Sequence, residues 1–386
     1  MVSLGPAAVL ALCAPLMHAC MGELPAELPA ELAAPGSLLV LDADAGEAQD
    51  DGERRGVVFV AAPDGQGGWE APTLLATDVR WLEPVALVTL SDRSLLVVES
   101  RWPHDRADAA PETPGRGALF RIAPGAPGGV ELWWSDPRLR RPIAAVLAPD
   151  GTLYVSDRDA DPLGLGAPTG AVFALRPGPD GGRPSEPARI AAAGPELVTP
   201  GPLLALPDGR VLLMDADRNP LGLDLPSGIP RTAGELYELR DGALISRAQP
   251  TLTVSPIGML LRAPHDLFII DANAGDRPPH LGDGAVFRLD TSDLGGPLHT
   301  VVSSTTLGRR HALADPAGGD VLPDGRLLIV DANLDPLHLG PDGTGKGVYG
   351  TGPGAVMWLD PEQQTLALAL ASERFVMPLD VHVVRP

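Results

Sequence analysis

The chain has 386 residues, a formal charge of -21 at pH 7 and an isoelectric point near 4.6. This balance argues against a nucleic-acid-binding protein, because phosphate backbones are bound through clustered Lys and Arg, and Lys occurs only at Lys346. Hydrophobic residues make up 44%, enough for a large core. The body of the chain contains no apolar run of about eighteen residues, which argues against an integral membrane protein.

Residues 1–20 are predicted to be an export signal. Residues 1–19 carry no charged side chain and are mostly apolar, as in a secretory signal. Residues 16–20 resemble a degenerate bacterial lipoprotein box, in which a small residue precedes the lipidated Cys. Cys20 is therefore the candidate lipidation site, and a simply cleaved signal is the alternative. Either way we expect an exported protein: periplasmic, secreted or a cell-surface lipoprotein that meets the membrane only through its lipid anchor.

Residues 21–36 are predicted to be a flexible tether. This stretch contains the Pro-punctuated sequence ELPAELPAELAAP, which is of low complexity and typical of a linker. Both cysteines, Cys13 and Cys20, precede it. The domain that follows has no Cys, so we expect it to depend on its core and not on a disulfide.

A repeat of about 58 residues runs through the rest of the chain. An apolar run that ends in an acidic residue recurs six times, and the acids are spaced 57, 58, 58, 56 and 60 residues apart. The six acids are Asp42, Glu99, Asp157, Asp215, Asp271 and Asp331. A regular period of this length indicates an array of supersecondary units.

Each repeat contains the signals of four short strands. An Asp-Gly turn or a variant of it precedes the acidic run, as at residues 149–151, and predicts a hairpin. A Gly then opens a third strand, and a fourth apolar run follows, as at residues 367–371. One large side chain of the third strand is predicted to pack between neighbouring units: Phe59, Phe120, Phe173, Tyr237, Phe287 and Met357. Four strands with tight turns form one blade of a β-propeller.

The two ends of the chain are predicted to complete one blade together. An X-Pro step opens the first strand of each unit, at Pro84, Pro142, Pro200, Pro256, Pro316 and Pro378. The sixth such strand has no repeat after it, whereas the first repeat begins at its second strand. Pairing these two strands removes two sheet edges. The predicted fold is all-β: a six-bladed β-propeller over residues 37–386 with four-stranded blades, closed by the C-terminal strand completing blade one.

Residues 37–386 resemble the six-bladed propellers of the NHL-repeat and gluconolactonase-like superfamily. The resemblance rests on the recurring Pro-Asp-Gly-x-Leu-x-Val-x-Asp core. It implies the architecture of the blades. It implies no particular activity, because this core is structural in propellers of very different function.

The loops after the acids are candidate Ca²⁺ sites. Oxygen-bearing side chains at the first, third and fifth positions are how short loops wrap this cation. The candidate ligands are Asp157, Asp159, Asp161, Asp215, Asp217, Asn219, Asp331, Asn333 and Asp335. The Gly and Glu that usually complete such a loop are absent. In the alternative interpretation, the first acid accepts backbone N–H bonds that close the loop, and the later residues form Asx-turns.

Residues just before the six prolines are expected to rim one mouth of the channel. Candidate ligands for a divalent metal there are Glu83, Asp315 and Asp380, with Asp320 and His382 nearby on the inner strands. The resemblance to gluconolactonase-like enzymes implies a single metal at this place, and Glu83 followed by Pro84 looks like their first-ligand motif. Their remaining ligands do not match. A metal at this mouth would polarise a lactone carbonyl or generate a bound hydroxide.

These patterns favour an exported or lipid-anchored binding or scaffold module, with Ca²⁺ in its Asp-rich loops, over an enzyme. No blade carries a convincing set of nucleophile, base and orienting group, and no motif for an organic cofactor is present. Six similar loops form a broad surface, so we expect a monomer with a protein or glycan partner on this loop face. The alternative is a metal-dependent lactonase or related hydrolase with its site at the channel mouth.

Overall fold

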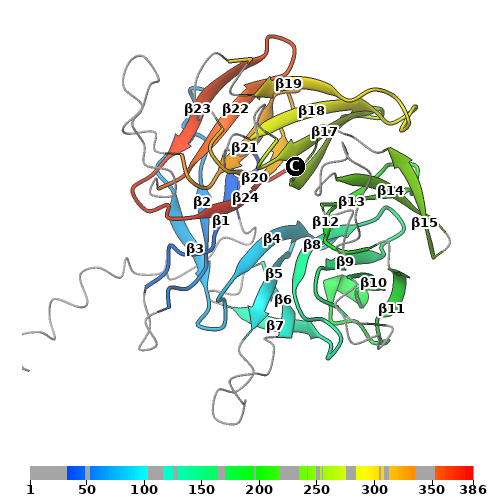
Figure 1. The fold of residues 1–386 in the computed structure, drawn as a ribbon. Helices are drawn as coiled ribbons and strands as arrows, with labels where there is room; N and C mark the ends of the chain where they lie inside the picture. The colour runs from blue at the N-terminus through cyan, green and yellow to red at the C-terminus, as the bar shows by residue number, and fades with distance from the viewer. Residues whose placement is uncertain are drawn as a thin grey trace, which may run out of the picture.

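The computed structural model describes residues 33–47, 53–102, 116–124, 129–160, 162, 170–194, 197–216, 234–240, 242–248, 253, 255–274, 284–303, 306–307, 313–334 and 353–385. Within them the chain forms strands β1 to β24, arranged in six antiparallel sheets of four. Figure 1 shows the sheets placed around a centre near which the C-terminus lies. Among the described residues, no helix has the length and apolar character needed to cross a membrane.

The first three blades, each given from its inner to its outer strand, have the following bounds. Blade one consists of β24 (Pro378–Val383), β1 (Leu38–Asp42), β2 (Val57–Ala61) and β3 (Thr73–Thr77). Blade two consists of β4 (Pro84–Thr89), β5 (Leu95–Trp102), β6 (Arg116–Ile122) and β7 (Val130–Ser135). Blade three consists of β8 (Pro142–Leu147), β9 (Leu153–Asp157), β10 (Ala171–Leu175) and β11 (Arg189–Ala193).

The other three blades repeat this order. Blade four consists of β12 (Pro200–Ala205), β13 (Val211–Asp215), β14 (Glu235–Arg240) and β15 (Ala243–Ala248). Blade five consists of β16 (Pro256–Ala263), β17 (Asp266–Asp271), β18 (Ala285–Asp290) and β19 (His299–Ser303). Blade six consists of β20 (Pro316–Val321), β21 (Leu327–Asp331), β22 (Ala355–Asp360) and β23 (Thr365–Ala371).

The predicted six-bladed propeller and its mode of closure are confirmed. Strand β24 pairs antiparallel with β1, so that Val381 lies opposite Val40 and Val383 opposite Leu38. The first strand of every blade begins at the predicted proline. Each inner strand contacts the next, from β4 through β8, β12, β16 and β20 to β24 and back to β4. The chain ends therefore meet in one sheet and leave no open blade edge at the seam.

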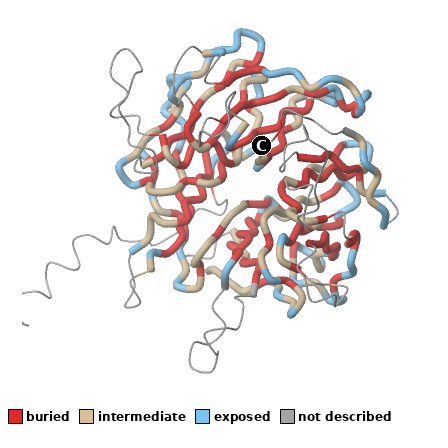
Figure 2. Tube along the Cα trace, in the orientation of Figure 1, coloured by how far each residue is buried: buried red, intermediate tan, exposed pale blue. Residues whose placement is uncertain are grey.

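The core lies between the blades, as predicted from the large residue of each third strand. All six of these residues are buried: Phe59, Phe120, Phe173, Tyr237, Phe287 and Met357. Phe120 of blade two, for example, belongs to the same apolar cluster as Leu39 and Val58 of blade one. Figure 2 shows that buried residues run along the strands while exposed residues gather at the turns. Burial of facing sheets against one another thus holds the ring together.

A glycine and a proline meet at every junction between blades. The glycine at the start of each third strand faces the proline that opens the next blade, and a Cβ on it would press into the ring. The pairs are Gly56 with Pro84, Gly117 with Pro142, Gly170 with Pro200, Gly234 with Pro256, Gly284 with Pro316 and Gly354 with Pro378. Only Gly leaves room for the ring at this distance. The repeated glycines and prolines are therefore explained together, because each glycine of one blade contacts the proline that opens the next blade.

The residue three places before each proline is buried in the same junction. These residues are Trp81, Leu139, Leu197, Thr253, Leu313 and Phe375, each no more than 1% exposed. In four junctions the glycine N–H also donates to the carbonyl of this residue, as from Gly117 to Leu139 at 3.0 Å. The linker that enters each blade is consequently anchored to the blade before it.

We expect Gly117→Ala to lower the free energy of unfolding by about 1–3 kcal/mol, because the new methyl group would overlap Cγ and Cδ of Pro142. Chemical denaturation followed by circular dichroism measures this change. Gly295→Ala is the matched control, since a Cβ there meets only ordinary contacts at 3.6 and 3.8 Å, and its effect should stay within about 0.5 kcal/mol. Equal effects of the two substitutions would contradict the proposed packing role of the junction glycine.

Candidate functional site

The six repeated acids close the loops between strands and are buried. Asp42, Glu99, Asp157, Asp215, Asp271 and Asp331 are each at most 1% exposed. Asp157 shows the pattern: its Oδ2 accepts N–H bonds from Arg140 at 2.6 Å and Arg141 at 3.0 Å, and its Oδ1 accepts one from Asp159 at 2.9 Å. The acid at the end of the second strand thereby holds the linker that leads into the first strand of the same blade.

The same arrangement recurs around the ring. Asp331 accepts N–H bonds from Ala314, Asp315 and Asn333. Asp42 accepts them from Val376 and Met377, which links the start of the chain to its end. These first acids thus have the loop-closing role that the sequence offered as the alternative to Ca²⁺ binding. Because their oxygens already accept two or three N–H bonds, a cation in these loops would compete with the backbone for them.

Burial raises the pKa of four of these carboxyl groups, those of Asp42, Glu99, Asp157 and Asp331. Removal from water raises the pKa of Asp157 and of Asp331 to about 6, even though the backbone N–H bonds work in the opposite direction. Glu99 is the most strongly affected, and burial raises its pKa to about 8. Its Oε1 accepts N–H bonds from Glu83 and Arg101, both at 2.8 Å, whereas its buried Oε2 has no hydrogen-bond partner among the residues that the structure describes. Around neutral pH, Glu99 is therefore held mainly as the neutral acid.

The later residues of the predicted Ca²⁺ loops fall into two groups. Asp161, Asp217, Asn219 and Asp335 lie outside the described residues, as does Cys20. Asp159 and Asn333 are described, and Asn333 donates from Nδ2 to Oδ2 of Asp315 at 2.7 Å. Within the described part of the chain, no three His, Cys, Asp or Glu residues are grouped to hold a metal ion. Ca²⁺ binding by these loops stays a prediction.

The three predicted metal ligands of the channel mouth do not form one group. Glu83 pairs with Nη2 of Arg141 at 3.2 Å, and Asp315 accepts the hydrogen bond from Asn333. Asp380 lies two residues beyond its proline on β24, where Oδ2 accepts the N–H of Leu87 on β4 at 2.9 Å. Each carboxylate is therefore engaged by a different protein donor.

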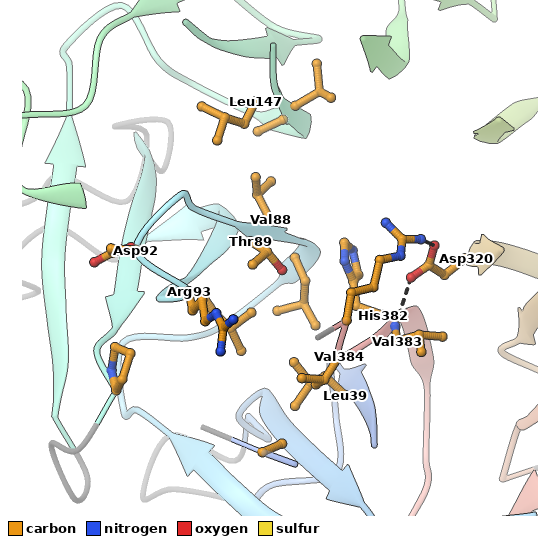
Figure 3. Close-up of a pocket in the computed structure, with 17 residues that line it drawn as sticks. Leu39, Val88, Thr89, Asp92, Arg93, Leu147, Asp320, His382, Val383 and Val384 are labelled. Atoms are coloured by element: carbon orange, nitrogen blue, oxygen red, sulfur yellow. Dashed lines mark hydrogen bonds and ion pairs between the residues drawn. The ribbon is translucent and has the colours of Figure 1, made fainter. Parts of the chain in front are cut away.

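A cavity of about 730 Å³ lies at the other end of the channel. Its walls come from the inner strands β4, β8 and β24, with Asp320 of β20 and the hairpin residues Asp92 and Arg93. Because β4 runs from Pro84 at the acid-bearing end to Thr89 at this hairpin, the cavity opens on the face opposite to the predicted loop face. Figure 3 shows His382 and Asp320 on one side of it and Leu147 and Val88 on the other.

Two acids hold the inner strands together beside this cavity. Asp320 of blade six accepts the N–H of Val383 on β24 at 2.8 Å, and Asp380 on β24 accepts the N–H of Leu87 on β4. These bonds satisfy backbone groups that the inner edges of the sheets would leave unpaired. Gly318 lets β20 approach, since a Cβ there would collide with Oδ1 of Asp380. The channel is thus charged along blades six and one.

His382 carries a partly exposed imidazole into the cavity. Its Nε2 lies 3.3 Å from Oδ2 of Asp380. Burial lowers the pKa of His382, but the negative charges of Asp380 and Asp320 outweigh it, so the pKa lies above the usual value. Arg385 completes the group by donating from Nη2 to Oδ1 of Asp320 at 2.6 Å. The cavity therefore has a charged side that is rich in hydrogen-bond donors.

From the sequence we expected Asp320 and His382 near a metal at the opposite mouth of the channel. The sequence nevertheless contains a pattern that marks these two residues as unusual. The fourth residue after the blade-opening proline is apolar in four blades, as Val88, Val146, Leu204 and Leu260, and is Asp320 or His382 in the other two. Two charged residues at a position that is otherwise apolar mark the blades that build the polar side of the cavity. The apolar side has no comparable sequence signal, because its residues look like ordinary inner-strand residues.

Comparison with known proteins supports the fold alone. No protein-family model matches the sequence, so the NHL-repeat assignment is not confirmed. No curated protein matches it either. A chain in the crystal structure of a nidogen/laminin complex has a TM-score of 0.57 and 12% identity, covering 90% of this chain and 97% of that chain. A protein of unknown function from Bacteroides caccae has a TM-score of 0.51 and 14% identity, covering 92% and 100%.

A gluconolactonase from Xanthomonas campestris is also similar, with a TM-score of 0.45 and 16% identity over 93% of this chain and 91% of that chain. The two likenesses at 12% and 14% identity show the propeller architecture and no activity. The function has to be argued from the residues of the channel.

We expect stability to fall as pH rises from about 5 to about 8, because the folded state retains the Glu99 proton in this range and the unfolded state has already lost it. The loss should be on the order of a few kcal/mol. Glu99→Gln keeps an uncharged side chain of the same shape and should flatten this part of the profile in urea denaturation. Glu373→Gln, at an exposed position, should leave the profile unchanged. A Glu99→Gln profile identical to wild type would contradict the assignment.

If the acidic loops bind Ca²⁺, excess Ca²⁺ should raise the melting temperature and EDTA should reverse the effect, because a ligand of the folded state adds about 2.7 kcal/mol at 100 times its dissociation constant. Differential scanning calorimetry measures the shift. Asp161→Asn and Asp335→Asn should reduce it. Asp150→Asn, in a hairpin on the opposite face, should not. Identical melting with Ca²⁺ and with EDTA would exclude these sites.

Proposed function

We propose that this protein is an exported propeller that binds a small organic molecule in its channel, with the hairpin-end cavity as the binding site. The observation that carries the proposal is the cavity itself. Its volume of about 730 Å³ falls within the range of about 300–1,000 Å³ that is typical of small-molecule sites. Its combination of an apolar wall with a few convergent polar groups is also typical of such sites.

The cavity is built on rigid elements, which supports a binding role. Its walls are the inner strands of three neighbouring blades, and bonds from Asp320 and Asp380 fix the spacing of β20, β24 and β4. A site whose side chains are held before the ligand arrives loses less conformational entropy on binding. Export through residues 1–20 and Ca²⁺ in the loops of the other face belong to the same proposal and rest on sequence patterns.

We expect the neutral dye N-phenyl-1-naphthylamine to bind at one saturable site, with increased fluorescence in apolar surroundings. Thr89→Trp should weaken this binding at least about tenfold, because Thr89 is exposed at the end of β4 and lines the cavity. Thr73→Trp places the same bulk at an exposed position on the outer strand β3 and should leave dye binding unchanged.

Two results would count against this function. Dye binding that is absent, or equal in the two tryptophan variants, would exclude the cavity as the site. Lactone hydrolysis that depends on an added divalent metal and is lost in Glu83→Gln would instead place the function at the opposite mouth, where Glu83 pairs with Arg141. A panel of lactones assayed on the same samples makes the distinction.

A further inference from the structure

We infer that the ligand of this cavity is an amphipathic organic anion: a molecule with a carboxylate or similar oxyanion at one end and an apolar body. This inference rests on the proposed function, because it assigns a ligand class to the same cavity. It follows from the apolar part of the cavity lining and from the bonds that the polar groups of the lining already make to the protein.

Much of the cavity lining is apolar. Val88 of β4 packs in the same apolar cluster as Ala145 and Leu147 of β8, and Leu87 of β4 packs in the cluster that contains Leu39; all five residues line the cavity. These residues bring hydrocarbon and no side-chain hydrogen-bonding group. Each CH₂ group of a ligand that is removed from water here contributes about 0.8 kcal/mol. An apolar body of several carbon atoms would therefore supply most of the affinity.

The acids that line the cavity are already bound to protein donors. Oδ1 of Asp320 accepts from Arg385, and Oδ2 accepts the N–H of Val383. Asp92 accepts from Arg121 through one oxygen and from Ser94 through the other. A cationic head group would have to share these oxygens with guanidinium groups or backbone N–H groups, which makes a ligand cation a poor fit.

The polar groups of the lining that remain available to a ligand are hydrogen-bond donors. The contacts of Arg385 within the described part of the chain use only Nη2, and its side chain is 64% exposed, so the rest of the guanidinium is open to a ligand. His382 contacts Asp380 through Nε2, which leaves Nδ1 for another partner. Oxyanions accept from such donors more strongly than neutral groups do.

The overall charge of -21 does not prevent an anion from binding here. At physiological ionic strength the Debye length is about 8 Å, so distant carboxylates are largely screened. The charges that decide the outcome are those that line the cavity: Arg93, His382 and Arg385 against Asp92, Asp320 and the adjacent Asp380.

The test compares three ligands with the same chain and different head groups: octanoate, octan-1-ol and octylamine. Each displaces N-phenyl-1-naphthylamine from the purified full-length protein at pH 7, and the displacement curves give the affinities. We expect octanoate to bind at least about tenfold more tightly than octylamine, and more tightly than octan-1-ol.

Variants locate the head group. Arg385→Gln should weaken octanoate about 10- to 100-fold, the effect of losing one charge-assisted hydrogen bond, and should change octan-1-ol by less than about threefold. Arg374→Gln is the control, because Arg374 is exposed, contacts the carbonyl of Pro72 and does not line the cavity. Circular dichroism confirms that each variant is folded.

The possible results separate the two proposals. If octan-1-ol or octylamine binds as tightly as octanoate, or if Arg385→Gln weakens all three ligands equally, the anion assignment is wrong and the cavity stays a binding site. If none of the three displaces the dye and Thr89→Trp has no effect on dye binding, both the ligand class and the proposed function are wrong.

Discussion

The closed ring depends on the contacts by which two neighbouring blades fix the linker between them. On one side a glycine of the preceding blade receives the proline ring, as Gly117 receives Pro142. On the other side the buried acid of the following blade accepts the N–H bonds of the residues just before that proline, as Asp157 does. The contact is short-ranged on both sides and leaves little freedom in the angle between blades. Repeated six times, it closes the ring without a disulfide.

The same junction explains why buried acids recur in a protein whose core is otherwise apolar. Each carboxyl is removed from water at a cost, and this burial raises the pKa of Asp157 and of Asp331. Each also accepts backbone N–H bonds that would otherwise be unpaired. Residues that occur in every blade therefore serve the assembly of the ring. Residues that depart from the repeat, such as Asp320 and His382, are not required for ring assembly and can therefore have a different role. In a repeat protein, residues that differ from the other repeats at the same position are therefore candidates for a functional site.

The channel is consequently asymmetric although the blades are alike. Blades six and one contribute Asp320, Asp380, His382 and Arg385, whereas blades two and three contribute aliphatic side chains from β4 and β8. Strand β24 carries Asp380 and His382, two residues of the charged group, and it is also the strand that closes the ring. Closure and the proposed site are thus coupled, since the polar side of the cavity exists only when the two ends of the chain have paired.

The sequence by itself determined the period, the number of blades, the strand that closes the ring and the large residues between blades, such as Phe120 and Phe173. These features follow from local turn chemistry and from hydrophobic alternation repeated six times, which a single chain displays directly. Only the tertiary structure decided that the repeated glycines and prolines contact one another, and that Asp320, His382 and Arg385 gather beside Leu147. Those contacts join segments far apart in sequence, and their distances depend on how the blades pack and not on any local pattern.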